Sequence, residues 1–71
     1  MPTTTLGENL KASRKNYGLT QTEIAKRLKV DQSTYAGYET GKSTPNIEIL
    51  WKLADIYGTS LDILTGRYIK N

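Results

Sequence analysis

The sequence predicts a single all-α domain over residues 1–71, and three observations carry that prediction. Residues that favour helix starts recur along the chain, glycines recur where those helices would end, and no alternating β-branched pattern lies between them. A chain of 71 residues is short enough for one domain with one core. Five helices are expected at about residues 6–17, 21–28, 32–39, 47–57 and 61–65, with a tail at 67–71.

The first two helices each follow a Thr-x-x-Glu pattern. Thr5 with Glu8, and Thr20 with Glu23, have the spacing of a capping box, in which each side chain bonds the backbone N–H of the other residue. The apolar residues that follow at helical spacing are Leu6, Leu10 and Tyr17 in the first helix and Ile24, Ala25 and Leu28 in the second.

The other three helices are bounded by similar residues. Asp31 is a good N-cap for the third helix, which is expected to end by Gly41 because the Lys-Ser-Thr-Pro that follows favours a turn. Asn46 can cap the fourth helix, Gly58 ends it, and Ser60 starts the fifth. The side chains expected to be buried here are Ile47, Leu50, Leu53, Ala54, Tyr57, Leu61 and Leu64.

The composition argues against several classes of function. The chain contains neither cysteine nor histidine, so disulfides, thiolate metal sites and histidine-based catalysis are excluded. The Asp and Glu residues are scattered and form no evident acid-base pair or metal cage. We therefore expect no enzyme, no metal and no cofactor. No signal peptide and no membrane-length apolar run is evident, and a cytoplasmic protein is expected.

The net charge of +3 belongs entirely to the first part of the chain. Residues 1–42 hold seven Lys or Arg and four Asp or Glu, whereas residues 43–71 hold three of each. A polyanion such as nucleic acid would therefore meet the first part, releasing counterions from its phosphates. The alternative is an ordinary solubilising surface charge.

Residues 20–41 are the most informative unit: a capped helix, a turn and a second short helix, a spacing at which two helices cross steeply. If Tyr35 and Tyr38 point inward, the outward face of the second helix is small, polar and uncharged. Such a face fits a DNA major groove, where Gln can bond adenine through two hydrogen bonds and small residues can meet a thymine methyl. The alternative is a plain solvated face. Its residues are Gln32, Ser33, Ala36, Gly37 and Thr40.

Four stretches carry a family resemblance: GLTQTEIAKRL from Gly18, VDQSTY from Val30, YETGK from Tyr38, and Pro45. In this order they resemble the Cro/cI-type helix-turn-helix family of phage and bacterial repressors, also called the XRE family, and the similarity extends from Leu6 to Gly66. The resemblance implies a compact five-helix, lambda-repressor-like fold. It also implies a Cro-like transcriptional regulator that binds a pseudo-palindromic operator in double-stranded DNA, with its recognition helix in the major groove.

The resemblance also implies roles for individual residues. Base contacts are expected from Gln32, Ser33 and Gly37, to which the outward face adds Ala36; Gly37 departs from the family in having no side chain. Contacts to the sugar-phosphate backbone fix register and affinity rather than sequence. They are expected from Thr20, Gln21, Thr34, Thr40, Lys42, Ser43 and Thr44.

Two further positions matter for the shape of the motif. Arg14 and Glu39 match a pair that in some family members bridges the first helix to the end of the recognition helix; the alternative is two exposed, unpaired charges. Lys29 stands where the family usually has glycine, so a left-handed residue there would carry a steric cost.

The second part of the chain suggests a protein partner. Tyr35, Tyr38 and Tyr57 are expected in the core rather than stacked on bases. Side chains expected to be exposed, and to form a homodimer or partner contact, are Trp51, Ile63, Tyr68 and Ile69, with Ile49 also off the buried stripe. The alternative function is a protein-binding module on the same fold, such as an antirepressor or antitoxin that engages another regulatory protein.

Overall fold

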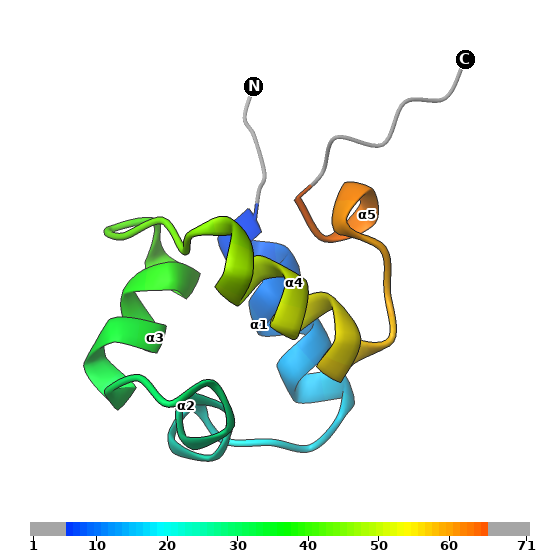
Figure 1. The fold of residues 1–71 in the computed structure, drawn as a ribbon. Helices are drawn as coiled ribbons and strands as arrows, with labels where there is room; N and C mark the ends of the chain where they lie inside the picture. Colours follow the sequence, from blue (N-terminus) through cyan, green and yellow to red (C-terminus); the bar gives the residue numbers. More distant parts are fainter. Residues whose placement is uncertain (1–5, 66–71) are drawn as a thin grey trace.

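The computed structural model describes residues 6–65, which form five α-helices and no strand, as predicted (Figure 1). The predicted bounds agree with the observed ones to within one residue. The first helix ends one residue earlier than expected and the third runs one residue further. The helices are α1 Leu6–Asn16, α2 Gln21–Leu28, α3 Gln32–Thr40, α4 Ile47–Tyr57 and α5 Leu61–Thr65.

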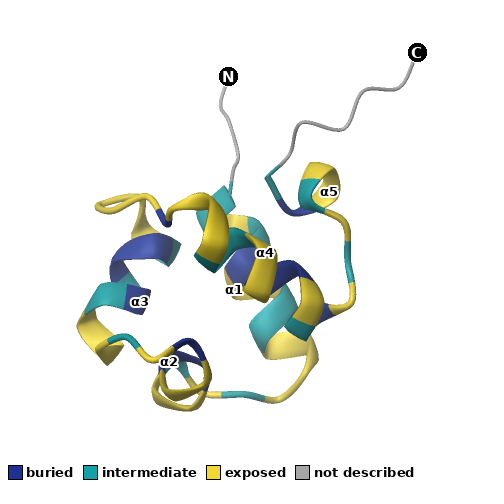
Figure 2. Ribbon diagram, viewed as in Figure 1, coloured by how far each residue is buried: buried dark blue, intermediate teal, exposed yellow. Residues whose placement is uncertain are grey.

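All five helices contribute to one core (Figure 2). Tyr35 of α3 is fully buried at its centre, and α1 supplies Leu10, which is likewise inaccessible. The small Ala25 is buried on α2, as expected for close helix packing. α3 lies to one side of α1 and α5 to the other (Figure 1). The buried apolar residues are Leu10, Ile24, Ala25, Leu28, Tyr35, Tyr38, Leu53, Ala54, Tyr57 and Leu64.

The buried stripe of α4 differs from the predicted one at its start. Ile47 was expected in the core but is 60% exposed, whereas Ile49, expected off the stripe, is half-buried and packs against the core. Ile49 precedes the fully buried Leu53 by four residues and therefore shares its face. Ile47 lies in the first turn of α4, two residues after the buried Pro45.

Tyr17 also differs from the prediction. It was expected on the apolar face of the first helix, but α1 ends at Asn16 and Tyr17 is 52% exposed. Its ring still packs beside that of Tyr57, with centroids 5.8 Å apart, and its hydroxyl donates to the Tyr57 carbonyl oxygen at 3.1 Å. Tyr17 therefore covers the end of α4 from outside the core.

The helix caps explain where α2 and α3 begin and end. The Thr20 and Glu23 capping box is confirmed: Thr20 Oγ1 accepts from the Glu23 N–H at 3.1 Å, and Glu23 Oε1 accepts from the Thr20 N–H at 2.8 Å. Lys29 ends α2 with φ 63° and ψ 41°, a left-handed conformation that costs a side-chain-bearing residue free energy. Asp31 precedes α3 in an extended conformation, although its side chain makes no capping bond within the described part of the chain. Thr5, the first predicted cap, lies outside the described residues.

Residues 6–65 contain neither a membrane-spanning helix nor a cluster of metal-ligating side chains. None of the five helices has the length and apolarity to cross a bilayer. No group of three or more Asp or Glu side chains in this range is arranged to hold a metal ion.

Candidate nucleic-acid interface

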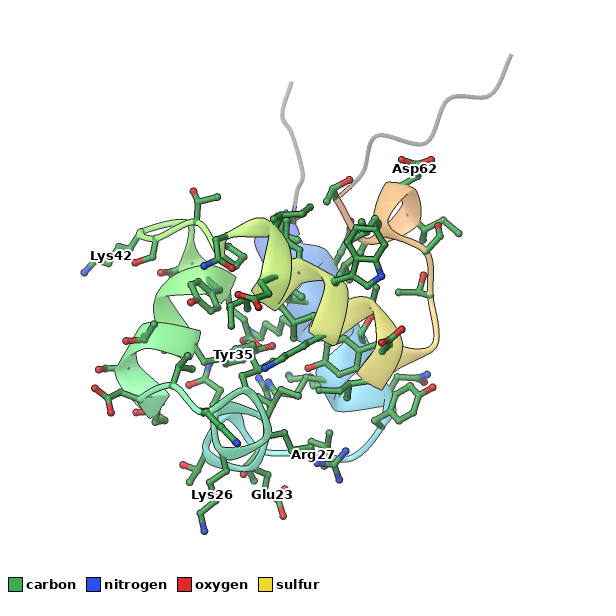
Figure 3. All side chains as sticks on the ribbon, viewed as in Figure 1. Glu23, Lys26, Arg27, Tyr35, Lys42 and Asp62 are labelled. Carbon is green, nitrogen blue, oxygen red and sulfur yellow. The ribbon has the colours of Figure 1, made fainter. Side chains whose placement is uncertain are left out.

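α3 presents two different faces. Tyr35 and Tyr38 point into the core, 0% and 7% exposed, with their rings edge to face and 6.0 Å between centroids. On the opposite side Gln32 and Ser33 are exposed and Ala36 is half-buried. Figure 3 shows Tyr35 pointing inward from α3 and Lys42 extending away from the loop that follows it. The inward tyrosines therefore set the rotation of the helix about its axis, and that rotation turns the small polar residues outward.

The outward residues line a shallow hollow on the surface. The hollow brings together the four residues that were predicted to contact bases and two of those predicted to contact the DNA backbone. These are residues from the first turn of α3, its last turn and the loop beyond it. The lining residues are Gln32, Ser33, Ala36, Gly37, Thr40 and Lys42.

Gly37 requires a correction. It was expected to face outward freely, but it is buried, because the loop after α3 folds back over it. A Cβ atom at Gly37 would lie 3.1 Å from Ser43 Oγ. Gly37 therefore forms the floor of the hollow and is covered from the side by Ser43.

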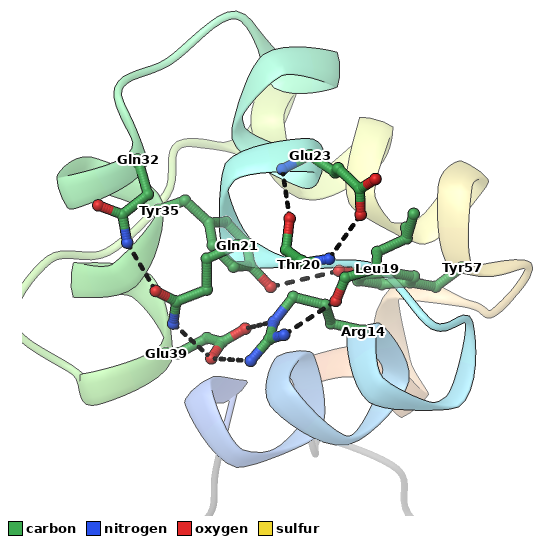
Figure 4. Close-up of polar contacts among 9 residues, drawn as sticks. All are labelled: Arg14, Leu19, Thr20, Gln21, Glu23, Gln32, Tyr35, Glu39 and Tyr57. Atoms are coloured by element: carbon green, nitrogen blue, oxygen red, sulfur yellow. Dashed lines mark hydrogen bonds and ion pairs between the residues drawn. The ribbon is translucent and has the colours of Figure 1, made fainter.

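Arg14 of α1 and Glu39 of α3 form the bridge expected from the sequence (Figure 4). Arg14 Nε donates to Glu39 Oε2 at 2.7 Å and Nη2 donates to Oε1 at 3.2 Å, which gives a two-pronged ion pair. The two side chains are only 11% and 3% exposed. Arg14 Nη1 also donates to the Leu19 carbonyl oxygen at 2.9 Å, so one guanidinium holds both α3 and the loop before α2.

Two glutamines continue this network to the start of α3. Gln21 Nε2 donates to Glu39 Oε1 at 3.0 Å, and Gln32 Nε2 donates to Gln21 Oε1 at 2.7 Å (Figure 4). Gln21 and Gln32 were each predicted to contact DNA, but the bond between them was not predicted. A usable signal was present, because each is the first residue of its helix and the two helices are consecutive. The first outward side chain of α3 is thus connected, bond by bond, to α1.

The ionisation of this cluster is set by its surroundings. Burial alone would raise the pKa of Glu39, but the Arg14 guanidinium, the Tyr35 hydroxyl and the Gln21 amide together lower it below its ordinary 4.5. The hydrogen bond to Glu39 raises the pKa of Arg14. Burial raises the pKa of Tyr35 and Tyr57, whose hydroxyl oxygens lie 3.2 Å apart. The Arg14 and Glu39 pair is therefore charged, and both tyrosines are neutral, around neutral pH.

The residues predicted to contact the DNA backbone lie near the two ends of α3. At one end, Gln21 bonds Gln32, and the Thr20 hydroxyl oxygen next to it already caps α2. At the other end the Thr40 hydroxyl is engaged within the protein, because it donates to the Gly37 carbonyl oxygen at 3.3 Å and accepts from the Lys42 N–H at 3.4 Å. Thr34 is half-buried, whereas Lys42, Ser43 and Thr44 in the loop after α3 are all exposed.

The predicted partner residues are exposed where the structure describes them. Trp51 of α4 is 58% exposed and Ile63 of α5 is 57% exposed. Neither belongs to the outward face of α3. Tyr68 and Ile69 lie outside the described residues.

Comparisons with known proteins agree with this geometry. Residues 10–64 match the family described as helix-turn-helix. The chain is similar to the transcriptional regulator ImmR of Bacillus subtilis, with 36% identity over 87% of this chain and 49% of that protein. A crystal structure of a transcriptional regulator from Listeria innocua superposes with a TM-score of 0.86 and 37% identity, over 94% of this chain and 62% of that chain.

A second solved structure is a repressor bound to DNA. The P22 c2 repressor in complex with a synthetic operator has a TM-score of 0.82 and 28% identity, over 89% of this chain and 96% of that chain. The present chain spans about half the length of the curated relatives it matches. On the match over residues 10–64, the chain belongs to the helix-turn-helix family, of the Cro/cI or XRE type that its motifs predicted.

Proposed function

We propose that this chain binds double-stranded DNA sequence-specifically as a cytoplasmic transcriptional regulator of a phage or bacterium, with α3 in the major groove. The observation that supports it best is the outward face of α3. Exposed Gln32 and Ser33 share a shallow hollow with half-buried Ala36. This face is complementary to base edges, because the Gln32 amide and the Ser33 hydroxyl can both donate and accept hydrogen bonds.

Gln32 is the residue best prepared to read a base. One N–H of its amide is held by Gln21 Oε1 at 2.7 Å, which orients the side chain. The second N–H and Oε1 remain for a base edge, and adenine offers a matching acceptor and donor in the major groove. Because Gln21 is itself held by Glu39, the amide is oriented before DNA arrives and loses less side-chain entropy on binding.

Affinity would come from the two ends of α3. Gln21 lies at the start of α2, where free backbone N–H groups and the helix dipole favour a phosphate. Lys42, Ser43 and Thr44 are exposed beyond the other end of α3. Contacts of this kind fix the register of α3 on the duplex without reading sequence.

Selection of bound sites from a random duplex pool, followed by binding measurements on the selected site, tests the proposal. Gln32→Ala should change the preference at one base step by about 1–3 kcal/mol, whereas Lys42→Ala should weaken all duplexes alike and reduce the salt slope by about one. Thr22→Ala, an exposed change on α2 outside the hollow, is the matched control. If no duplex is enriched, or neither variant differs from the control, the proposed function is wrong.

We also propose that the chain acts as a homodimer on a pseudo-palindromic operator. Trp51 and Ile63 are large, exposed and apolar, and they lie on α4 and α5 rather than on the reading face. A two-fold dimer would place two copies of α3 about one helical turn of DNA apart. Ultracentrifugation of the wild type and of Ile63→Asp, with and without a selected duplex, tests this. A monomer in every condition contradicts it.

A protein-binding module on the same fold is the second candidate. It is favoured by the exposure of Ile47, Trp51 and Ile63 and by the loss of Gly37 as a free reading position. Such a module would shift no purified duplex in a mobility-shift assay. Retention of duplex DNA with a steep salt dependence decides for the regulator instead.

A further inference from the structure

Gly37 lies at the reading face of α3 and beneath the loop that follows it. It lines the hollow on the outward face of α3, yet it is buried. The cover is the loop that follows the helix. A Cβ atom at this position would lie 3.1 Å from Ser43 Oγ, 3.5 Å from Ser43 Cβ and 3.7 Å from Lys42 Cβ. The side of the helix that a base would approach is therefore already in contact with the loop.

The carbonyl group of Gly37 holds the same loop by hydrogen bonds. It accepts from the Gly41 N–H at 3.0 Å and from the Ser43 N–H at 3.2 Å. The Thr40 hydroxyl donates to it as well, at 3.3 Å. Gly37 therefore contacts the loop both by van der Waals packing and through hydrogen bonds to its carbonyl oxygen.

We propose that Gly37 is a positioning residue: it seats the Lys42–Thr44 loop against α3, so that the loop, and not residue 37, meets the DNA. This inference rests on the proposed function and replaces the expectation that Gly37 contacts a base. The ammonium of Lys42 and the hydroxyl groups of Ser43 and Thr44 are donors suited to phosphate oxygens. Seated on Gly37, they are held at a fixed distance from the first turn of α3.

Adding one methyl group to Gly37 distinguishes a residue that positions the loop from a residue that contacts a base. The nearest atom to that methyl is Ser43 Oγ, which would have to move by a few tenths of an ångström, and the loop would shift with it. Shifted phosphate donors weaken all duplexes alike, whereas a base-contacting residue changes the preference at one step. Stability should not fall, because alanine favours the helix interior more than glycine does.

The experiment compares Gly37→Ala, Ser43→Ala and the double variant with the wild type. Two quantities are measured: hydrogen exchange of the Ser43 amide in the free protein, and affinity for a selected duplex and for an unrelated duplex. Gly37→Ala should speed Ser43 amide exchange and weaken both duplexes by the same factor, about 3- to 10-fold, with an unchanged or higher Tm. In the Ser43→Ala background the nearest contact relaxes to an ordinary 3.5 Å, so Gly37→Ala should add no further loss.

Three results would overturn the proposal: unchanged Ser43 amide exchange in Gly37→Ala, a changed preference at one base step, or losses that simply add in the double variant. Ser33→Ala is the control on the same face, and should alter base preference without altering Ser43 exchange. If the wild type enriches no duplex, the proposed function is wrong, and so is the proposal that the loop contacts DNA. The exchange measurement then still decides whether Gly37 seats the loop.

Discussion

Two short helices, α3 and α5, pack on opposite sides of α1, and they are held there by different means (Figure 1). α3 is fixed by the buried ion pair from Arg14 to Glu39 and by close approach of Gly7 to its last turn. α5 is fixed by the buried Leu64 and by Asn9, whose Nδ2 donates to the carbonyl oxygens of Leu64 at 2.9 Å and Ile63 at 3.4 Å.

The two modes of attachment suit the two helices to different uses. The buried Tyr35 and Tyr38 set the rotation of α3, and the ion pair on its inward side fixes its last turn to α1, so its outward face can remain small and free. α5 has five residues and a single side-chain cap from α1, so its exposed Ile63 can adjust to a partner at lower cost.

The largest effect is expected from Glu39→Ala. It leaves the Arg14 guanidinium buried without its partner, which should lower the free energy of unfolding by about 3–5 kcal/mol. Urea unfolding followed by circular dichroism measures it. Replacing the pair together, as Arg14→Met with Glu39→Leu, should restore most of the loss because no unpaired charge remains. A loss below about 1 kcal/mol for Glu39→Ala would show that the pair behaves as an exposed one.

Gly7→Ala should be the next most harmful change. A Cβ atom at Gly7 would overlap the backbone carbonyl oxygen of Glu39 and approach that of Tyr38 to 3.1 Å. Backbone cannot rotate away as a side chain can, so we expect a loss of about 3 kcal/mol in the free energy of unfolding. Gly37→Ala, whose new methyl has its tightest contact with the Ser43 side chain rather than with backbone, is the matched control and should not destabilise the fold. Equal Tm values for the two variants would refute this explanation.

Lowering the pH should weaken the attachment of α3 to α1, because it removes the same ion pair between Arg14 and Glu39. The pKa of Glu39 is lower in the folded protein than its ordinary 4.5, so its contribution to stability is complete above that value. That contribution is lost as the pH falls through the lowered folded pKa, since protonated Glu39 gives up the ion pair. Urea unfolding at several pH values between about 7 and 3 measures this. Glu39→Gln should show a shallower decline; an identical slope would exclude Glu39 as a source.

Asn9→Ala should loosen α5 while leaving α3 in place. It removes the donor to the last carbonyl groups of α5, at a cost of about 1 kcal/mol. Hydrogen exchange should rise in α5 and not in α3. Asn9→Asp keeps the shape but cannot donate when ionised, so it should lose at least as much. Faster exchange in α3 as well would mean that the two helices are not independently held.

The smallest effect is expected at the turn between α2 and α3. Lys29→Gly removes the side chain from a left-handed residue with φ 63°, which should raise stability by about 0.5–1 kcal/mol. Lys29→Ala keeps the Cβ and removes the rest of the side chain with its charge, so it should bring no comparable gain. Thermal unfolding of both variants decides between strain and charge at this position.

The fold could be predicted because its signals are local. Capping residues, glycines and apolar spacing act within one helix turn, and the Thr20 and Glu23 box and the end of α4 at Gly58 follow from them directly. At Lys29 the family resemblance, in which glycine is usual, left open a strained or a differently shaped turn, and the structure shows the left-handed one. Ile47 and Ile49 were placed wrongly because both lie in the first turn of α4, where the apolar run Ile-Glu-Ile-Leu fits two helical stripes and only packing shows that Ile49, and not Ile47, faces the core.

The site was predicted only in part, because its remaining features are contacts between distant segments. The pairing of Gln21 with Gln32, and the hydroxyl contact between Tyr35 and Tyr57, depend on how helices cross. The burial of Gly37 depends on a loop that turns back over the helix it follows. Sequence identified the residues of the hollow, and only three-dimensional packing distinguishes those that face outward from the one that supports the loop.

The exposure of Trp51 has a practical consequence for optical studies. It is the one tryptophan of the sequence, it lies on α4, and more than half of its surface is open to water. Its fluorescence should therefore be red-shifted and readily quenched by iodide in an isolated subunit. A blue shift on concentrating the protein would report subunit association at α4, whereas ligands docking on α3 should leave the emission spectrum nearly unchanged.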